Sequence, residues 1–228
     1  MIGRMKVLGL DSAGSQCAVA VLDGERVASA RAEAMPRGQA ERLMPLIAET
    51  LAAASIAPAA LDLIAVTTGP GSFTGIRIGL AAARGLALAT GRSVVGVGVF
   101  DSYAAAVPPP ARQARTLIVA VESKRDEFYL QAFKATGAAL APPAQVHPRD
   151  LAAWLPSGPL VLAGDAAMRL QAQLAGHDIV MAADAHAVDA AWVARLGRVQ
   201  ANGGAVEPPR PFYLRAPDTT TPRRTATP

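Results

Sequence analysis

Cysteine, histidine and aromatic residues are scarce in this sequence of 228 residues. Its single cysteine, Cys17, excludes a disulfide within the chain and suits a reducing compartment. The three histidines, His147, His177 and His186, have no spacing typical of a metal site. Aromatic residues make up only 4% of the chain, which argues against a stacking surface for single-stranded nucleic acid.

Charged residues are also few, at 18%, and the net charge of +4 is spread evenly. Residues 1–100 hold 9 Lys and Arg against 7 Asp and Glu, and residues 101–228 hold 13 against 11. The chain therefore lacks a basic segment of the kind that binds nucleic acid strongly by itself. Hydrophobic residues make up 51%, enough for a buried core in one domain or two small lobes.

Long hydrophobic runs are absent as well. Arg77 and Arg84 interrupt the most apolar long window, Ile76–Gly91, so that window does not predict a membrane span. The apolar stretch that precedes Asp11 is too short for the core of a signal peptide. We therefore expect a cytoplasmic protein with no membrane association.

The first hundred residues predict a β-meander followed by alternating helices and strands. The turn signal Asp23-Gly24 joins two short segments of strand character, which is typical of a hairpin. Leu43, Ile47 and Leu51 then recur at helical spacing. The predicted strands are Lys6–Leu10, Cys17–Leu22, Val27–Glu33, Leu61–Thr67 and Ser93–Val99, and the predicted helices are Ala40–Ser55 and Gly75–Thr90.

The same β pattern recurs in the second half of the chain. Leu117–Val121 is an apolar strand that ends at Glu122, as the first strand ends at Asp11. A second strand, Glu127–Phe133, and a third near Gln145 complete a duplicated βββ unit. The remaining predicted elements are a short helix, Pro148–Trp154, a strand, Leu160–Ala163, and a helix, Ala187–Asn202. We expect an N-terminal lobe of residues 1–100, a C-terminal lobe of residues 101–215, and a disordered tail of residues 216–228.

The segment Gly69–Gly79, with the sequence GPGSFTGIRIG, lies between a predicted buried strand and a predicted helix. Gly71 lets the backbone approach a neighbour closely, and Ser72 or Thr74 can cap the helix. The helix N-terminus could hold a phosphate, although no Gly-Lys-Ser/Thr follows and this is not a Walker loop. From the spacing alone, phosphate binding and a tight turn without a ligand are equally open.

Small residues recur every four positions along the following helix, at Gly75, Gly79, Ala83, Ala87 and Gly91. Such a row lets a neighbouring helix come unusually close. The neighbour is either the helix Ala40–Ser55 of the same lobe or a helix of a partner. Arg77 and Arg84 lie seven positions apart on one face and need partners if they are buried.

Four segments together resemble the TsaB family, also called YeaZ. They are VLGLDSAGSQCAVAV from Val7, GPGSFTGIRIG from Gly69, the helix end GLALA from Gly85 and PFYLR from Pro211, and the resemblance extends from Lys6 to about Arg215. It implies an α/β fold of two lobes, the actin-like ATPase fold of the sugar kinase, actin and chaperone ATPase superfamily, with duplicated βββαβα lobes.

The resemblance also implies a function. TsaB-like chains are the non-catalytic scaffold of a bacterial complex with TsaD and TsaE, and they pair with themselves when alone. The complex transfers a threonylcarbamoyl group to the adenosine beside the anticodon in tRNAs that read codons beginning with A. TsaD carries the metal and the chemistry, and TsaE is an ATPase. This chain would then be no enzyme by itself and would meet tRNA only through the complex.

In that family the two helices of the N-terminal lobe bind TsaD, and here they correspond to about Ala40–Ala54 and Gly75–Thr90. The resemblance therefore predicts a partner interface on these helices, made of Leu43, Ile47, Arg77, Gly79, Leu80, Ala83, Arg84 and Ala87.

Two segments depart from the family's patterns. Arg37–Pro45 lacks the His-x-x-x-His that binds metal in the catalytic paralogue, and Gln39 stands where many TsaB-like chains have a lone histidine. Glu122–Tyr129 reads Glu-Ser-Lys-Arg-Asp-Glu-Phe-Tyr in place of the usual Asp-Ala-Arg-Arg-Gly-Glu-Val-Tyr, which leaves the role of that loop open. We therefore expect no metal in this chain.

In working ATPases of this fold, an acid follows the first strand close to the metal and the phosphates. Asp11 holds this position here, so Asp11, Ser12, Gly71 and Ser72 are the candidates to bind ATP or ADP. In the other interpretation, Asp11 caps its own turn through backbone hydrogen bonds. We expect no firmly bound cofactor, and an independent ATP-binding, kinase-like protein of the same fold is the second hypothesis.

Overall fold

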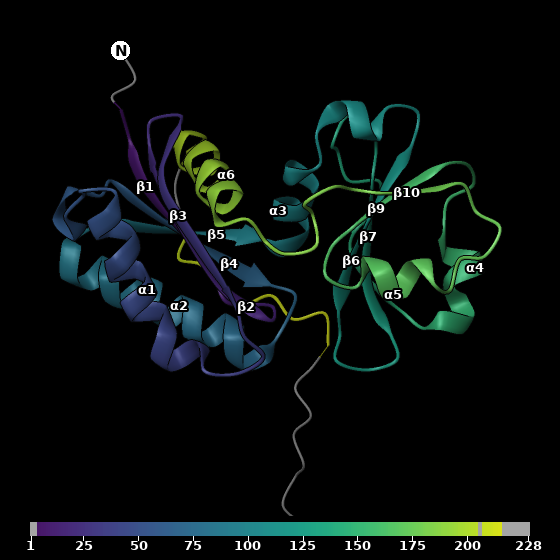
Figure 1. Cartoon of the computed structure of the whole chain (residues 1–228), viewed down its shortest axis with the longest axis horizontal. Helices are drawn as coiled ribbons and strands as arrows, with labels where there is room; N and C mark the ends of the chain where they lie inside the picture. The colour runs from purple at the N-terminus through teal and green to yellow at the C-terminus, as the bar shows by residue number, and fades with distance from the viewer. Residues whose placement is uncertain (1–3, 205–206, 216–228) are drawn as a thin grey trace, which may run out of the picture.

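The computed structural model describes residues 4–204 and 207–215, which form two lobes side by side (Figure 1). The N-terminal lobe is built on a five-stranded sheet of order β3-β2-β1-β4-β5. Its strands are β1 (Lys6–Asp11), β2 (Gln16–Asp23), β3 (Arg26–Ala34), β4 (Leu63–Gly69) and β5 (Ser93–Gly98). β1, β2 and β3 are antiparallel, whereas β1, β4 and β5 are parallel. The parallel strands β1 and β4 are apolar almost throughout because helices cover both of their faces.

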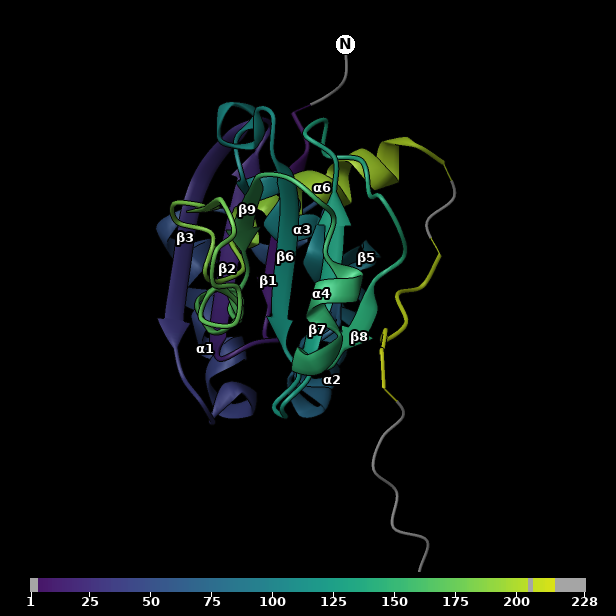
Figure 2. The ribbon, with the colours of Figure 1, turned by 90° about the vertical axis from the view of Figure 1, so that its right-hand side faces the viewer.

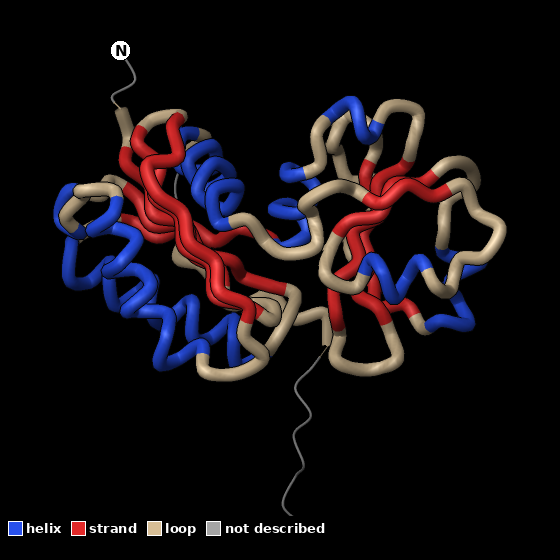
Figure 3. The backbone as a smooth tube through the Cα atoms, in the orientation of Figure 1, coloured by secondary structure: helices blue, strands red, loops and turns tan. Residues whose placement is uncertain are grey.

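Helices α1 (Gln39–Ala53) and α2 (Phe73–Thr90) lie together on one face of this sheet, and α6 (Ala190–Asn202) lies on the other (Figures 1 and 3). Two glycines let α6 come close to the strands. A Cβ on Gly9 would overlap the carbonyl of Ala190, and a Cβ on Gly197 would overlap the side chain of Ala65. Although α6 follows the second lobe in the sequence, it is therefore a structural part of the first.

The C-terminal lobe repeats the arrangement with a sheet of order β10-β9-β6-β7-β8 (Figure 2). Its strands are β6 (Thr116–Glu122), β7 (Phe128–Phe133), β8 (Ala144–Val146), β9 (Leu160–Ala163) and β10 (Ile179–Met181). As in the first lobe, the first strand is antiparallel to the second and parallel to the fourth. The matching strand orders confirm the duplication that the β pattern predicts. The helices are shorter here, with η3 (Pro148–Asp150), α4 (Leu151–Trp154) and α5 (Ala167–Gln171).

Helix α3 (Val99–Ala106) lies between the lobes and joins their cores. Successive side chains of β6 point alternately into two different cores. Leu117 and Val119 belong to the core that continues through α3 into the first lobe, whereas Ile118 and Ala120 pack into a separate core with α4 and α5. The remaining short helices, η1 (Pro58–Ala60) and η2 (Pro109–Arg112), lie in connections.

After α6, residues 207–215 run along the first lobe toward the second, and we name this segment the C-terminal strap. The amide of Phe212 donates a hydrogen bond of 2.8 Å to the carbonyl of Thr68 at the end of β4. A Cβ on Gly69, whose φ is +112°, would overlap the carbonyl of Phe212. The strap therefore seats directly on the turn that leads into α2.

The predicted strands and the long predicted helices are confirmed, with bounds shifted by a few residues. One lobe assignment is wrong, because α6 and much of the strap pack on the first lobe although they lie within residues 101–215. Helix α3 was not predicted, since Val99 was assigned to the end of a strand. The predicted disordered tail, residues 216–228, lies outside the described residues. Within the described part of the chain, no helix combines the length and hydrophobicity needed to cross a membrane.

Candidate functional site at the junction of the lobes

The turn after β1 and the turn before α2 pack against each other. The amide of Ser72 donates a hydrogen bond of 2.7 Å to the carbonyl of Ala13. Glycine is required on the other side of this contact, because a Cβ on Gly71 would overlap the Ala13 carbonyl and one on Gly75 would overlap the Ser12 carbonyl. The glycines of the GPGSFTG segment thus serve contact within the lobe. Ser72 also caps α2, since its Oγ accepts from the amide of Gly75 at 3.2 Å.

Asp11 is fully buried beside this contact. Its Oδ1 accepts hydrogen bonds from Thr67 Oγ1 at 2.7 Å and from the amide of Ala13 at 3.2 Å. Its Oδ2 has no partner within the described residues. Burial raises the pKa of Asp11, and the hydrogen bonds from Thr67 and Ala13 oppose that shift. The bond to Ala13 is the turn cap that the sequence left open as one interpretation.

Ser12 is also buried, and its hydroxyl donates a hydrogen bond of 2.9 Å to the carbonyl of Gly75. A nucleotide phosphate or its metal would need an accessible carboxylate and free amides at this turn. Here the Asp11 carboxylate is covered and the Ala13 carbonyl points at Ser72. In this arrangement Asp11 and Ser12 do not fit a bound nucleotide.

Asp165, which directly follows Gly164 after β9, faces the same junction from the second lobe. Its Oδ1 accepts a hydrogen bond of 2.9 Å from the amide of Glu122. Burial, and then the charges of Glu122 and Asp11, raise the pKa of Asp165 to about 6 despite that bond. Tyr103 on α3 is buried nearby, and burial followed by the charges of Asp165 and Asp11 raises its pKa well above the usual value. Sequence reasoning singled out Asp11 but not Asp165, although the end of the strand at Gly164-Asp165 was the available signal.

Arg169 on α5 holds the loop whose sequence departs from the family pattern. Its guanidinium donates to both carboxylate oxygens of Glu122, at 2.9 and 3.2 Å, and to the carbonyls of Asp126 and Glu127, at 2.9 and 3.0 Å. It also lies 3.8 Å from the centre of the Phe128 ring. The glutamate at position 122 therefore has a structural role, because it anchors the loop to α5.

A cavity of about 540 Å³ opens between the lobes. Three segments form its wall, namely the turn into α2, the β6–β7 loop with Tyr129 on β7, and the end of the strap. The lining residues are Pro70, Gly71, Ser72, Phe73, Thr74, Ser123, Lys124, Arg125, Tyr129, Tyr213, Leu214 and Arg215. Of the four predicted phosphate or nucleotide residues, Gly71 and Ser72 line this cavity, whereas Asp11 and Ser12 do not.

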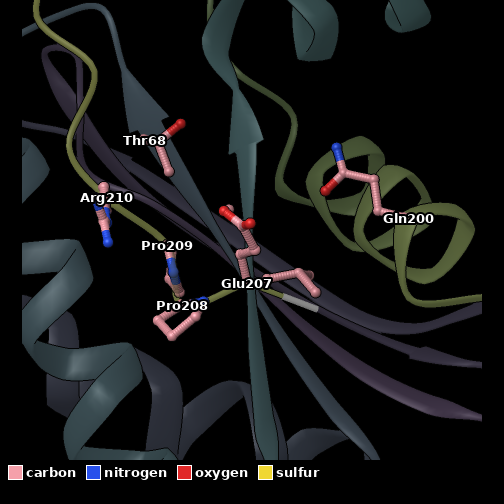
Figure 4. Close-up of a pocket in the computed structure, with 8 residues that line it drawn as sticks. Thr68, Gln200, Glu207, Pro208, Pro209 and Arg210 are labelled. Atoms are coloured by element: carbon pink, nitrogen blue, oxygen red, sulfur yellow. The ribbon is translucent and has the colours of Figure 1, made fainter. Parts of the chain in front are cut away.

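A second cavity of about 390 Å³ lies on the first lobe, between α6, β5 and the strap (Figure 4). Its charged lining residues are Glu207 and Arg210, both on the strap, so the lining carries no excess of either charge. Gln200 extends toward it from α6, and Thr68 lies at the end of β4. Balanced charge and a wall formed largely by the strap make this cavity a weaker ligand site than the interlobe cavity.

The predicted partner interface requires a correction. Leu43, Ile47, Gly79, Leu80 and Ala83 are buried in the core of the first lobe. A Cβ on Gly79 would lie 2.8 Å from Ser12 Oγ and 3.3 Å from Val66 Cγ2. The first three small residues of the row on α2, Gly75, Gly79 and Ala83, are therefore buried within their own lobe. Ala87 is partly buried. A helical pattern identifies a face, but the stripe of small residues did not reveal that this face points inward.

The two predicted interface arginines secure the strap. Arg84 donates a hydrogen bond of 2.7 Å to the carbonyl of Pro209, and Arg77 Nε donates one of 3.2 Å to the hydroxyl of Tyr213. The Arg77 guanidinium also lies 3.7 Å from the centre of the Phe73 ring, which contacts Tyr213 at 5.0 Å between ring centres. Both arginines therefore already have partners within the chain.

Besides Arg77 and Arg84, which are exposed, the outward face of α1 and α2 carries residues outside the predicted interface. Leu88 on α2 is 90% exposed and Met44 on α1 is 46% exposed. Small residues on the same faces are exposed as well, namely Ala48, Ala81, Gly85 and Ala89. We call this surface the outer helix face. Sequence reasoning missed it, although Leu88 and Met44 were visible as apolar residues outside the buried stripes.

His147 and Cys17 are the remaining candidate groups whose side-chain environments the structure describes. His147 Nδ1 accepts from the amide of Arg149 at 3.3 Å and so caps a short helix. Burial, and then the charges of Asp11 and Glu33, raise the pKa of the Cys17 thiol to about 11, which makes it a poor nucleophile. Across residues 4–204 and 207–215, no group of three or more His, Cys, Asp or Glu side chains is placed to hold a metal ion.

Comparison with known structures identifies the fold class of the chain. The activator of the 2-hydroxyisocaproyl-CoA dehydratase from Clostridium difficile is 11% identical with a TM-score of 0.57, and the match covers 87% of this chain and 96% of that one. At that identity the likeness concerns the fold alone. Together with the two duplicated lobes, it makes this an actin-like ATPase fold of the α/β class.

The family follows from closer matches. The family model described as "TsaD: tRNA N6-adenosine threonylcarbamoyltransferase" matches residues 33–207. YeaZ from Pseudomonas aeruginosa is 27% identical with a TM-score of 0.75, over 92% of this chain and all of that one. The tRNA threonylcarbamoyladenosine biosynthesis protein TsaB from Escherichia coli is 31% identical over 125 residues, 55% of this chain and 53% of that protein. The chain belongs to this family and, within it, to the TsaB (YeaZ) proteins. It spans about half the length of the curated TsaB proteins it matches.

Proposed function

We propose that this chain is a non-catalytic scaffold subunit in the transfer of a threonylcarbamoyl group to tRNA. It works beside a TsaD homologue, which performs the transfer on the adenosine next to the anticodon, and a TsaE homologue. tRNA meets the chain only through that complex. The family supports the pathway. A role without chemistry is supported by the covered Asp11, and by a described part of the chain that holds no group of three or more His, Cys, Asp or Glu side chains placed for a metal ion.

The observation that carries the proposal is the outer helix face. Leu88, at 90% exposure, projects beside exposed small residues and Arg84, and a Cβ on the neighbouring Gly85 would meet nothing within 4 Å. A protruding leucine beside small residues lets a partner helix approach closely and bury apolar area. The TsaD homologue binds to this face, and a second copy of the chain occupies it when no partner is present.

The proposal is tested by purifying the chain with its cognate TsaD homologue and measuring complex formation by gel filtration and calorimetry. Leu88→Asp should weaken the complex by at least about tenfold, because it places an uncompensated charge in an apolar contact. Val199→Asp is the matched control, since Val199 is a 64% exposed apolar residue on α6, on the other face of the sheet. Equal loss in both variants, or no complex with the unaltered chain, would refute the proposal.

A second readout addresses the reaction. The threonylcarbamoyl modification of tRNA is reconstituted with the TsaD and TsaE homologues, with and without this chain. We expect modification to require the chain and to fall in the Leu88→Asp variant. Self-pairing is measured by light scattering, where Leu88→Asp should be a monomer at concentrations at which the unaltered chain is a dimer.

The alternative, an independent ATP-binding and kinase-like protein, has less support because the Asp11 carboxylate is covered and the Ser12 hydroxyl is bonded to Gly75. Calorimetry with ATP and magnesium on the isolated chain, followed by an assay of phosphoryl transfer, separates the two functions. Phosphoryl transfer by the isolated chain would favour the alternative.

A further inference from the structure

Four exposed residues of α2 form a row along its outward side, namely Arg77, Ala81, Arg84 and Leu88. Their spacings of four, three and four residues are those of the contact positions in a coiled coil. The buried residues of the helix occupy other positions and face the core of the first lobe. Such a row stays in contact with a second helix over about three turns. We call it the α2 seam, and its geometry favours a partner helix that lies along α2.

Both arginines of the α2 seam are held in place by contacts within the chain. Arg84 donates a hydrogen bond of 2.7 Å to the carbonyl of Pro209, and Arg77 Nε donates one of 3.2 Å to the hydroxyl of Tyr213. The Arg77 guanidinium also lies over the ring of Phe73, 3.7 Å from its centre. A guanidinium has five N–H donors, so one such bond leaves most of them for a ligand outside the chain. The strap therefore orients the two exposed arginines without using up their capacity to donate hydrogen bonds.

The α2 seam carries positive charge that its own helix does not balance. Arg77 and Arg84 are the two charged residues of α2, and their partners on the strap, a hydroxyl and a carbonyl, are uncharged. On the neighbouring helix, Glu49 is paired with Arg42, and Glu41 lines a cavity at the first turns of α1 and α2. A protein that covers the seam must therefore supply negative charge, because an arginine that is buried without a counter-ion is costly.

We infer that the α2 seam binds an acidic helix of the partner protein, with one carboxylate opposite Arg77 and a second, seven residues along that helix, opposite Arg84. Apolar side chains of the same helix cover Ala81 and Leu88. Residues seven apart lie two turns apart on one side of a helix, which matches the separation of the two arginines. Pairs of arginine and carboxylate can form two parallel hydrogen bonds, so they fix the register of the partner as well as attract it. The inference rests on the proposed function and names the chemistry by which the TsaD homologue is recognised.

The first test places an amine at each arginine position of the full-length chain. Arg77→Lys and Arg84→Lys both keep a cation on the α2 seam, and each variant is mixed with the cognate TsaD homologue and treated with a water-soluble carbodiimide. The reagent joins a lysine amine to a touching carboxylate as an amide and is itself hydrated to a urea. Mass spectrometry should find each lysine coupled to one acid of the partner, and the two acids seven residues apart. Arg92→Lys is the matched control, since Arg92 is exposed, lies beyond the end of α2 and should not couple.

The second test reverses the charge. Arg77→Glu combined with Arg84→Glu should weaken the complex in calorimetry by about tenfold or more, and arginines in place of the two coupled acids of the partner should restore most of the affinity. Tyr213→Phe, which frees Arg77 from the strap but keeps the ring, should weaken the complex by about two- to fivefold, because the arginine is less well oriented.

The two tests separate this inference from the proposed function. A complex that Leu88→Asp weakens, but that the charge reversal leaves unchanged, would overturn the inference and leave the scaffold function standing. Loss of affinity without restoration, together with no coupling at either lysine, would overturn it as well. If the unaltered chain forms no complex with the TsaD homologue, both the proposed function and the inference are refuted.

Discussion

Asp165 accepts a hydrogen bond of 2.9 Å at Oδ1 from the backbone amide of Glu122. Glu122 is the last residue of β6, and Asp165 follows the end of the neighbouring strand β9. This single bond does not compensate the burial of the carboxylate, whose pKa rises from 3.8 to about 6. The folded protein therefore holds the Asp165 proton more tightly than the unfolded chain does.

The consequence is a loss of stability as pH rises. The contribution of Asp165 is complete below pH 3.8 and disappears as pH increases through about 6. The shift corresponds to about 3 kcal/mol in the free energy of unfolding. Asp165→Asn keeps the Oδ1 acceptor but cannot ionise, so its unfolding free energy should fall less between pH 4 and pH 7. Urea unfolding across this range measures the difference, with the exposed Asp184→Asn as control. Parallel pH profiles for the unaltered chain and Asp165→Asn would contradict the assignment.

Two glycines of α2 should respond in opposite directions to the same substitution. A Cβ at Gly79 would lie 2.8 Å from Ser12 Oγ, so Gly79→Ala should lower the free energy of unfolding by about 1–3 kcal/mol. A Cβ at Gly85 would meet nothing within 4 Å, so Gly85→Ala should raise it by about 0.5–1 kcal/mol through reduced backbone entropy. Chemical denaturation of both variants tests which side of α2 faces the core. Two changes of the same sign would reject this orientation.

These glycines also show how far the sequence could be interpreted. Strands such as β1 and β4 are short apolar runs between turn signals, and that pattern predicts them without knowledge of the fold. Whether Gly79 faces inward depends on Ser12 and Val66, which are far away in the sequence. Spacing along one helix contains no information about such contacts.

The same limit explains the misplaced lobe of α6. Its amphipathic pattern predicts a helix with one buried face but does not say which sheet that face covers. The answer lies in two close approaches, of Gly9 on β1 to Ala190 on α6 and of Gly197 on α6 to Ala65 on β4. Likewise, the cavity between the lobes combines segments around residues 72, 124 and 214, and only the folded chain brings them together. The candidate site was therefore predictable at Gly71 and Ser72 but not at its cations.

Arg169 should be difficult to replace even by another cation. Its planar guanidinium serves Glu122 and two loop carbonyls at once, a geometry that an ammonium group cannot reproduce. Arg169→Lys should lower the free energy of unfolding by about 1–2 kcal/mol, a value limited by the partial exposure of the pair. Arg149→Lys is the control, because Arg149 is 77% exposed and lies 3.7 Å from Asp150. If both variants unfold alike, Arg169 does not anchor the loop.

The strap offers a test of a single hydrogen bond. The amide of Phe212 donates to the carbonyl of Thr68, and Arg84 holds the strap three residues earlier through the carbonyl of Pro209. Arg84→Gln should therefore increase the rate of amide hydrogen exchange at Phe212 by about five- to tenfold, because the strap opens locally more often. Arg92→Gln is the matched control, since Arg92 donates a similar bond of 2.9 Å to the carbonyl of Ala59, elsewhere on the first lobe. Exchange at Phe212 that is equally fast in the unaltered chain and in both variants would mean that Arg84 does not hold the strap on β4.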